Sequence, residues 1–358
     1  MKVYKVGLIG FSVCGQAFHA PFIEGNAALE LYKVTARKPE QQTILRSRYP
    51  NAIAVQSADD IFDDEQIDIV VIATSNDVHY SFTKRALELG KHVVVEKPFT
   101  NTTEEADELI ALAEEKGLLL TVHQNARFHS DFKTVKKLIA RGDLGPVVNY
   151  EARFDRFRNF LREGAWRELD LPGSGVHFDL GPHLIDQAMQ LFGAPDSIFA
   201  DLRIQREGAK TIDDFEFILS YPQVKVSLKA QMLAKEPTPR FALYGWNGSF
   251  VKRGVDPQEA LLRDGVLPHN YPNWGEEDEE IYGTLNVVSD GVDRVERIKS
   301  EPGSGQDFFN NVVEVLNGKA ELLVKPAEAR DAIRVLEAAV QSWEEQRVVS
   351  LKGLLIAY

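Results

Sequence analysis

Hydrophobic and polar positions in the first third of the chain alternate between short apolar runs and longer stretches with helical spacing. Residues 67–73 form an almost unbroken apolar run, which is typical of a strand covered on both faces of a sheet. Further strands are predicted at 3–9, 29–35, 52–55, 92–95 and 118–122. Helices are predicted between them, at 16–23, 39–49, 77–89 and 103–116. Such alternation predicts right-handed crossovers and a doubly wound parallel sheet.

The pattern changes after residue 123. Longer segments with β-type alternation follow at 147–158, 197–205, 215–221, 224–232 and 240–245. Helices are predicted at 132–140, 184–191, 308–316 and 327–345, and the acidic run 276–280 is interpreted as a solvated loop. We therefore predict an α/β chain of two domains. A doubly wound parallel sheet occupies 1–123, and an α+β domain with a large, mostly antiparallel sheet occupies 124–358.

Charge and cysteine content narrow the classes of function. The 358 residues include 41 Lys and Arg against 54 Asp and Glu, which gives a net charge of −13. This balance disfavours nucleic acid and anionic membranes as partners, because both require a basic surface. The single cysteine excludes a disulfide framework and a zinc or iron–sulfur site built from cysteines, and it fits a reducing cytoplasm. No run of about 18 apolar residues occurs, so we expect no membrane span.

A glycine-containing turn follows the first predicted strand. Gly10, Ser12 and Gly15 occupy the three glycine positions of the dinucleotide-binding fingerprint of Rossmann folds. The helix that follows presents N–H groups to phosphates. An ordinary strand–helix turn is the alternative, because the middle position is serine. Placement after the first strand favours dinucleotide binding, with candidate contacts at Gly10, Phe11, Ser12 and Gly15.

The residues after the second strand bear on the choice between NAD and NADP. Sites for NAD place an acidic residue there, about 20 residues beyond the glycines. Residues 34–38 of this chain read VTARK and include no carboxylate. Arg37 and Lys38 can hold a 2′-phosphate through charge-assisted hydrogen bonds, so NADP is predicted in preference to NAD. A solvated basic loop is the alternative.

Polar residues also follow the fourth and fifth predicted strands. Ligands of open parallel sheets bind at the carboxyl ends of the strands, where these residues lie. A lysine beside a nicotinamide can hydrogen-bond the substrate oxygen as hydride leaves, or help to move its proton. For Lys97 the alternative is a surface lysine before a proline. The candidate cofactor contacts are Thr74, Ser75, Asn76, His79, Glu96 and Lys97.

Asp179 and His183 are candidates for proton transfer. Gly181 and Pro182 lie between them, which predicts a turn with Pro182 at the first helical position. His183 would then lie in the first helical turn, where the helix dipole keeps its ring neutral as a general base requires. Asp179 could orient that ring. The alternative is a helix start with a core histidine, and a metal site is disfavoured because no third ligand is indicated.

Substrate contacts are predicted from the second domain and its boundary. On the strand at 147–158, Arg153 and Asp155 share one face, which could supply hydrogen-bond donors to a substrate or form a subunit interface. The full set of candidates is Asn125, Arg153, Asp155, Trp166 and His177.

Taken together, these motifs resemble the Gfo/Idh/MocA family of oxidoreductases over essentially the whole chain. The resemblance rests on GLIG at 7–10 with FHAP at 18–21, TSN at 74–76 with His79, GKHVVVEKP at 90–98, and DLGPHLID at 179–186. Within the family, the chain is most similar to the NADP-dependent scyllo-inositol dehydrogenase group. The features that point there are FHAP, Arg37, FDRFR at 154–158, and Trp166 with Arg167.

The resemblance implies an NADP-dependent transfer of hydride between nicotinamide and a secondary alcohol or ketone of a cyclic polyol or sugar. Lys97, Asp179 and His183 would be catalytic, and the Lys97–Pro98 bond is expected to be cis. The second-domain sheet would cover the nicotinamide and mediate a homodimer or homotetramer. Ser12, Ser75 and Phe128-His129 depart from the family pattern, and the last of these departures leaves the substrate open. A catalytically silent sugar or cofactor sensor and a nicotinamide-dependent glycosidase are the alternatives on the same fold.

Overall fold

A computed structural model describes residues 2–162, 164 and 168–356, which separate into two compact units. Unit 1 comprises residues up to 128 together with 257–275 and 303–330. Unit 2 comprises 129–256, 276–302 and the residues from 331 onward. The division predicted between residues 123 and 124 follows the order of the sequence, whereas two later segments of the chain return to unit 1. Within the described ranges, no helix combines the length and the apolar character needed to cross a bilayer.

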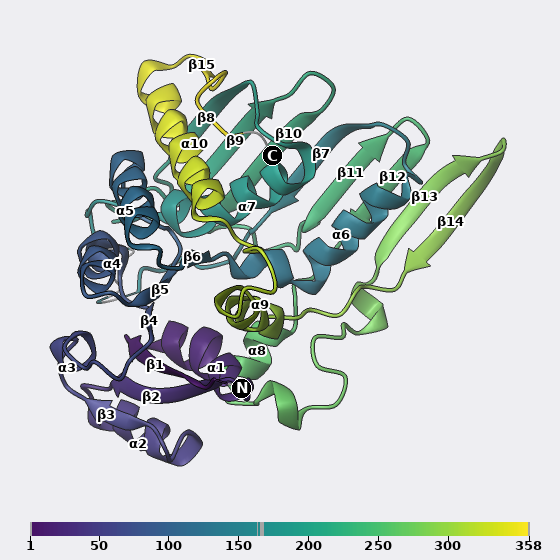
Figure 1. Ribbon diagram of the computed structural model, residues 1–358. Coiled ribbons are helices and arrows are strands. Elements are labelled where there is room, and N and C mark those ends of the chain that lie inside the picture. The colour runs from purple at the N-terminus through teal and green to yellow at the C-terminus, as the bar shows by residue number, and fades with distance from the viewer. Residues whose placement is uncertain (1, 163, 165–167, 357–358) are drawn as a thin grey trace. The chain divides into compact units, whose positions relative to one another are not determined.

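Unit 1 is built on a six-stranded sheet in which every pair of neighbours is parallel, as predicted (Figure 1). The strand order is β3-β2-β1-β4-β5-β6, which is a doubly wound arrangement. The strands are β1 (Tyr4–Ile9), β2 (Leu29–Thr35), β3 (Ile53–Val55), β4 (Ile69–Ile72), β5 (His92–Glu96) and β6 (Leu120–His123). All four residues of β4 are buried, which explains the unbroken apolar run in its sequence.

The helical segments of unit 1 include several short ones. The helix predicted at 16–23 is a π-helix, η1, followed directly by α1, and the one at 77–89 begins with the 3-10 turn η2. The segments before residue 129 are η1 (Gly15–His19), α1 (Ala20–Glu24), α2 (Pro39–Arg48), α3 (Asp59–Phe62), η2 (Asn76–Val78), α4 (His79–Glu88), α5 (Thr103–Lys116) and η3 (Asn125–Phe128). The later segments add α8 (Gln258–Arg263), η5 (Pro268–Asn270) and α9 (Gln306–Leu316).

The segment 303–330 is fixed to unit 1 by contacts between residues far apart in sequence. The Gln306 side-chain amide donates to the carbonyl of Phe22 at 2.9 Å, and the Thr121 hydroxyl donates to the carbonyl of Val324 at 2.8 Å. Phe308 and Phe309 are buried in the same hydrophobic cluster as β1 and β2. Their long sequence separation explains why a reading of local pattern assigned them to the second domain.

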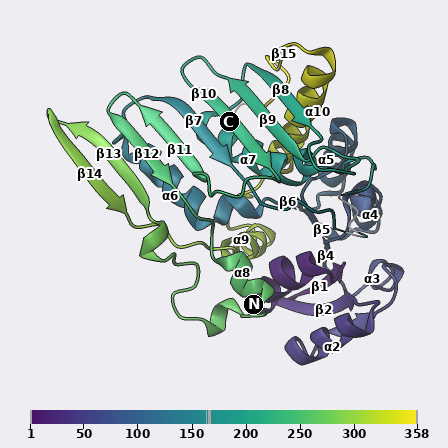
Figure 2. The same cartoon turned by 180° about the vertical axis from the view of Figure 1, so that it is seen from behind.

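Unit 2 contains a nine-stranded mixed sheet of order β14-β13-β12-β11-β7-β10-β9-β8-β15. Only β7 and β10 pair in parallel, so the predicted mostly antiparallel sheet is confirmed. Helices α6 (Ser130–Arg141), α7 (Val176–Phe192) and α10 (Pro326–Glu345) lie on one face of this sheet, in front of it in Figure 1 and behind it in Figure 2. The strands are β7 (Val147–Arg153), β8 (Ser197–Arg203), β9 (Asp214–Ser220), β10 (Lys225–Gln231), β11 (Phe241–Gly245), β12 (Gly248–Lys252), β13 (Gly283–Ser289), β14 (Val292–Ile298) and β15 (Val349–Ser350).

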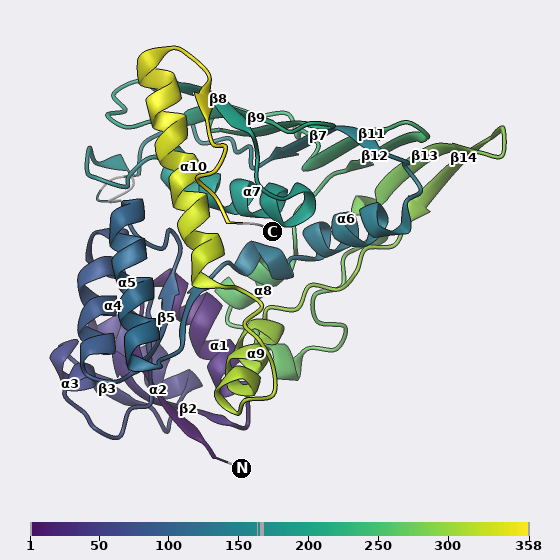
Figure 3. The same ribbon diagram turned by 45° about the horizontal axis from the view of Figure 1, so that its top comes forward.

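Two predicted boundaries in unit 2 are wrong. Strand β7 ends at Arg153 rather than at residue 158. Helix α7, seen beneath the sheet in Figure 3, begins at Val176, eight residues before the predicted start, and Pro182 lies inside it. Gly175 precedes the helix with φ +89°, a conformation that favours glycine, and its carbonyl accepts the N–H of Asp179 at 3.0 Å. The helix therefore starts at the glycine and tolerates the proline, although proline removes one N–H donor.

The acidic run at 276–280 is only partly the solvated loop that was predicted. Glu277 is buried, and one of its carboxylate oxygens lies 2.6 Å from the Lys252 ammonium. The hydroxyls of Ser130 and Ser300 donate to the same carboxylate at 2.5 and 2.6 Å. The other four residues of the run are exposed. A charge run in sequence does not show which member finds a buried partner.

Candidate functional site

The turn after β1 has the backbone geometry of a close-approach site. Gly10 has φ +101°, and a Cβ there would lie 2.3 Å from the carbonyl oxygen of Ala73. A Cβ at Gly15 would lie 2.0 Å from the carbonyl oxygen of Gly10, so both positions require glycine. Ser12 is exposed at the turn. Phe11 is buried with its ring edge-on to Tyr49, so only its backbone can face a ligand.

The end of β2 holds this turn and presents two cations. The Thr35 hydroxyl accepts the backbone N–H of Gly10 at 2.7 Å, which fixes the turn against the second strand. Arg37 and Lys38 follow and are exposed. Arg37 Nε donates to the carbonyl of Gln56 at 3.2 Å, and its remaining N–H groups lie on an exposed side chain. The local positive charge predicted from the sequence therefore stands beside the glycine turn.

Three buried oxygens mark the carboxyl ends of β4 and β6. They are Thr74 Oγ1, Gln124 Oε1 and Asn125 Oδ1, and none has a hydrogen-bond partner among the described residues. Buried polar atoms in native proteins are nearly always paired, so this edge of the sheet has hydrogen-bonding capacity for a ligand. Ser75 is half-buried at the same edge, and the Asn76 amide donates to Asn101 Oδ1 at 2.9 Å.

His79 connects the turns that follow β4 and β5. Its Nδ1 lies 2.8 Å from the carbonyl oxygen of Pro98, and its Nε2 lies 3.4 Å from that of Thr74. The ring is buried, and burial lowers its pKa. The Lys97–Pro98 peptide bond is cis, as the family resemblance implied. His79 was predicted to contact the cofactor, but both of its ring nitrogens contact protein backbone.

Glu96 is held by two histidines that the sequence analysis did not connect with it. Its Oε1 lies 2.7 Å from His19 Nε2 and 2.7 Å from His123 Nδ1, and its Oε2 accepts the backbone N–H of Lys97 at 3.2 Å. Burial alone would raise the pKa of Glu96, but His123 and His19 outweigh it and hold the pKa well below the usual value. Burial lowers the pKa of His19. Glu96 is therefore a buried anion directly preceding Lys97.

In unit 2, Asp179 and His183 both lie on α7, four residues apart. Side chains four residues apart on a helix are neighbours on one face. Arg156 Nη1 lies 4.0 Å from Asp179 Oδ2, and the Phe154 ring packs on the His183 ring with centroids 6.0 Å apart. The predicted place of His183 in the first helical turn is wrong, because α7 begins at Val176. Two turns separate the ring from that N-terminus, and the dipole acts mainly within the first turn.

Arg153 and Asp155 are not brought together with His183. Backbone hydrogen bonds from Phe154 to Lys229 and from Arg156 to Gln231 continue the extended pairing beyond β7. Alternation along this extended chain turns Arg153 and Asp155 to the face opposite Phe154. There they line a polar pocket of about 230 Å³ with Asp201 and Asp214. Asp155 is engaged by the backbone N–H of residue 231 at 3.2 Å and the hydroxyl of residue 238 at 2.8 Å. Their predicted substrate contact therefore lacks support from the geometry around His183.

The remaining substrate candidates fall at three different places. Asn125 belongs to the sheet edge of unit 1 described above. His177 is buried in the first turn of α7, and burial lowers its pKa to about 4. Two residues of separation place His177 on a different side of α7 from Asp179. Trp166 lies outside the described residues.

Two sequence profiles of one oxidoreductase family match the chain. The profile described as "Oxidoreductase family, NAD-binding Rossmann fold" matches residues 4–124. The profile described as "Oxidoreductase family, C-terminal alpha/beta domain" matches residues 136–351. Both carry the family name GFO_IDH_MocA. Together they cover most of the chain.

Similar proteins extend over nearly the full length. The Bacillus subtilis protein named scyllo-inositol 2-dehydrogenase (NADP(+)) IolW is 34% identical, covering 97% of this chain and 96% of IolW. The uncharacterized oxidoreductase YdgJ of Escherichia coli is 41% identical, covering 97% of this chain and 98% of YdgJ. Among solved structures, a Bacteroides fragilis protein assigned as an oxidoreductase is 44% identical with a TM-score of 0.89, covering 98% of this chain and 100% of that protein.

Proposed function

The chain belongs to the Gfo/Idh/MocA oxidoreductase family, and from this premise we propose that it is an NADP-dependent dehydrogenase of a cyclic polyol or sugar. The family assignment and the relative IolW, which is named a dehydrogenase, support an NAD(P)-dependent dehydrogenase acting on CH–OH groups. The relative named as NADP-dependent acts on an inositol, which supports the finer choice of cofactor and substrate. We propose that residues of both units take part in this reaction.

The residues of unit 1 fit a dinucleotide. The observation that carries the proposal is a set of buried oxygens at the carboxyl edge of the sheet that lack a hydrogen-bond partner among the described residues, namely Thr74 Oγ1, Gln124 Oε1 and Asn125 Oδ1. The close-approach turn at Gly10 would take the pyrophosphate, and Arg37 with Lys38 would take a 2′-phosphate. When bound, the nicotinamide supplies the two-electron acceptor for the substrate carbon.

The residues proposed as catalytic have separate tasks. His183 would accept the hydroxyl proton of the substrate, and Asp179 would orient the hydroxyl and the ring from the same helix face. Lys97 would donate a hydrogen bond to the substrate oxygen as charge develops on it. The Glu96 carboxylate accepts a hydrogen bond from the backbone N–H of Lys97, so a buried carboxylate fixes the turn that carries the lysine.

We also propose that subunits associate through the uncovered face of the unit 2 sheet, as a homodimer or homotetramer in the cytoplasm. Within the part of the chain that the structure describes, helices cover one face of this sheet (Figure 2). Phe199 on β8 and Tyr244 on β11 remain 37% and 43% exposed. Exposed aromatic side chains on a sheet face favour a protein interface.

A screen of inositols and aldoses with NADP⁺ tests the proposed activity. Absorbance of the reduced cofactor should rise with at least one cyclic polyol, and His183→Ala should lower kcat by about 100-fold or more, which is the usual contribution of a general base. Gln341→Ala, at an exposed position of α10, is the matched control and should retain wild-type turnover. Turnover that is unchanged in His183→Ala would remove this residue from the mechanism, and no reduction with any polyol or sugar would contradict the proposal.

A further inference from the structure

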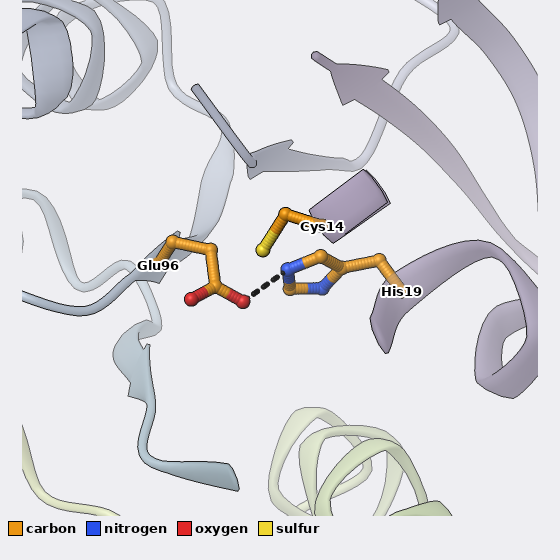
Figure 4. Close-up of side chains that lie close together, drawn as sticks. All are labelled: Cys14, His19 and Glu96. Atoms are coloured by element: carbon orange, nitrogen blue, oxygen red, sulfur yellow. Dashed lines mark hydrogen bonds and ion pairs between the residues drawn. The ribbon is translucent and has the colours of Figure 1, made fainter. Parts of the chain in front are cut away.

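A thiol, an imidazole and a carboxylate converge within unit 1 (Figure 4). Cys14 comes from the turn before η1, His19 from the end of η1 and Glu96 from the end of β5. The Cys14 sulfur, a His19 ring nitrogen and a Glu96 carboxylate oxygen all lie within 4.8 Å of one another. His19 and Glu96 are buried, whereas Cys14 is half-buried.

We propose that these three side chains form a binding site for one Zn²⁺-like transition-metal cation. Zn²⁺ takes thiolate sulfur, imidazole nitrogen and carboxylate oxygen as ligands at about 2.0 to 2.3 Å. Donors in a tetrahedral arrangement at those lengths lie about 3.3 to 3.7 Å apart. The 2.7 Å contact between His19 and Glu96 must therefore open, while a sulfur at the 4.8 Å limit moves closer by about 1 Å. Rotation of the half-buried Cys14 side chain can supply that movement.

The charge at this point favours a divalent cation. The Glu96 side chain is 7% exposed and anionic, and its side-chain partners among the described residues are the two imidazoles. With Cys14 as a thiolate, a bound dication faces two negative charges, and the buried site becomes neutral. Mg²⁺ and Ca²⁺ prefer oxygen ligands throughout, so sulfur and nitrogen donors select against both.

Metal binding changes the protonation of the ligands in a defined way. The Cys14 thiol loses its proton to solvent as the sulfur–metal bond forms. The His19 nitrogen facing Glu96 gives its lone pair to the metal, so the ring proton resides on Nδ1, and the 2.7 Å contact between His19 and Glu96 becomes two bonds to one cation. His123 Nδ1, 2.7 Å from Glu96 Oε1, keeps the carboxylate oriented. One proton is released for each metal bound.

Three protein ligands leave one coordination position for water, which is the arrangement of an exchangeable rather than a closed site. All three ligands belong to unit 1, so metal binding does not depend on the substrate proposed above. Spacings of 5 and 77 residues between the ligands match no zinc motif, which explains why sequence reading indicated no metal site.

Cobalt titration of the full-length protein tests the site. Protein treated with EDTA is titrated with Co²⁺, which occupies Zn²⁺ sites and shows an intense near-ultraviolet absorption when a thiolate is a ligand. We expect one equivalent per chain, displacement by Zn²⁺, and loss of the thiolate absorption in Cys14→Ser. His19→Gln and Glu96→Gln should each weaken Co²⁺ binding by about tenfold or more.

The controls separate ligand loss from misfolding. His269→Gln alters an exposed histidine of unit 1 and should leave the Co²⁺ spectrum and affinity unchanged. Circular dichroism checks the fold of each variant, and Glu96→Asp, which keeps the charge but shortens the side chain, should also weaken binding. Absence of a thiolate absorption in the wild type would overturn the proposal. Unchanged Co²⁺ affinity in folded His19 and Glu96 variants would overturn it as well.

Discussion

Arg37 is the residue on which the proposed preference for NADP most depends. Its side chain is exposed beside the glycine turn, and residues 34–38 include no carboxylate that would bind a ribose hydroxyl. Arg37→Ala should weaken NADPH binding by about 10- to 100-fold, because a hydrogen bond to a charged group contributes about 1.5 to 3 kcal/mol. NADH binding should change little. Fluorescence titration with both cofactors measures the ratio of the NADPH and NADH affinities.

Arg46 offers a matched control for this measurement. It is an exposed arginine on α2, beyond the turn that carries Arg37. Arg46→Ala should leave both affinities at wild-type values. Equal losses of NADPH and NADH affinity in Arg37→Ala would show that the side chain does not read the 2′-phosphate.

His177 predicts a pH dependence of stability. Burial lowers its pKa from 6.5 to about 4. Below pH 6.5 the unfolded chain therefore binds a proton at this ring that the folded chain does not bind. The free energy of unfolding therefore falls as the pH decreases from 6.5 towards 4. The loss reaches about 3 kcal/mol, because one unit of pKa difference corresponds to about 1.4 kcal/mol. His177→Gln should remove this part of the loss, measured by urea unfolding at pH 7.5 and pH 4.5.

The same substitution at an exposed ring is the comparison for that experiment. His269→Gln should keep the wild-type difference between the two pH values, because its surroundings change little on unfolding. If His177→Gln also keeps that difference, the protonation of His177 does not limit stability in acid.

Single residues differ in how far the sequence could predict them. Gly10 and Lys97 could be placed because each follows directly on a strand, and strand ends share one edge of a parallel sheet. The contacts of Glu96 with His19 and His123 could not, because they join residues 77 and 27 positions apart. Arg153 and Asp155 line the same pocket, in agreement with the side they were predicted to share, but no local pattern shows which side meets His183.

At the scale of elements, α6, β7, β11 and α7 meet at one buried cation. Arg240 immediately precedes β11, and its Nε lies 3.0 Å from Asp131 of α6. One further N–H donates to Gln187 of α7 at 2.9 Å, and another to the carbonyl of Arg153 at 3.1 Å. The guanidinium also stacks 3.6 Å from the Phe154 ring centroid. Because Phe154 packs on His183, Arg240 is positioned to fix the surroundings of the proposed base.

Removal of this cation should destabilise unit 2 strongly. Arg240→Met leaves the Asp131 carboxylate buried without its partner, which costs about 3 to 5 kcal/mol in comparable pairs. Urea unfolding followed by circular dichroism measures the loss. The double variant Asp131→Leu with Arg240→Met should lose clearly less than Arg240→Met alone. A double variant as unstable as the sum of the two single variants would contradict the pairing.

Elements were predictable where their pattern was local. Strand β4 was recognised because every residue is buried, and α5 because Thr102 and Glu105 form a capping box and Gly117 ends the helix. Strand β14 was missed because five of its seven residues are exposed, so no alternation marks it. The predicted start of α7 is too late because proline favours the first helical position, whereas Pro182 lies inside this helix.

At the scale of the whole molecule, a net charge of −13 coexists with a predicted polyanionic ligand. The overall charge disfavours an extended basic surface for nucleic acid, but Arg37, Lys38 and the backbone of the Gly10 turn provide local positive potential. Unit 1 is also discontinuous in the sequence, since 257–275 and 303–330 return to it. Overall composition therefore predicts neither the binding site nor the division into units.

Transfer of deuterium is the measurement that addresses the proposed function most directly. The full-length protein is incubated with NADP⁺ and scyllo-inositol carrying deuterium on its ring carbons, and the reduced cofactor is analysed by mass spectrometry. We expect one deuterium on the nicotinamide for each substrate molecule oxidised, with slower transfer in His183→Ala. Reduced cofactor without deuterium, or conversion of a sugar without net cofactor reduction, would contradict a polyol dehydrogenase.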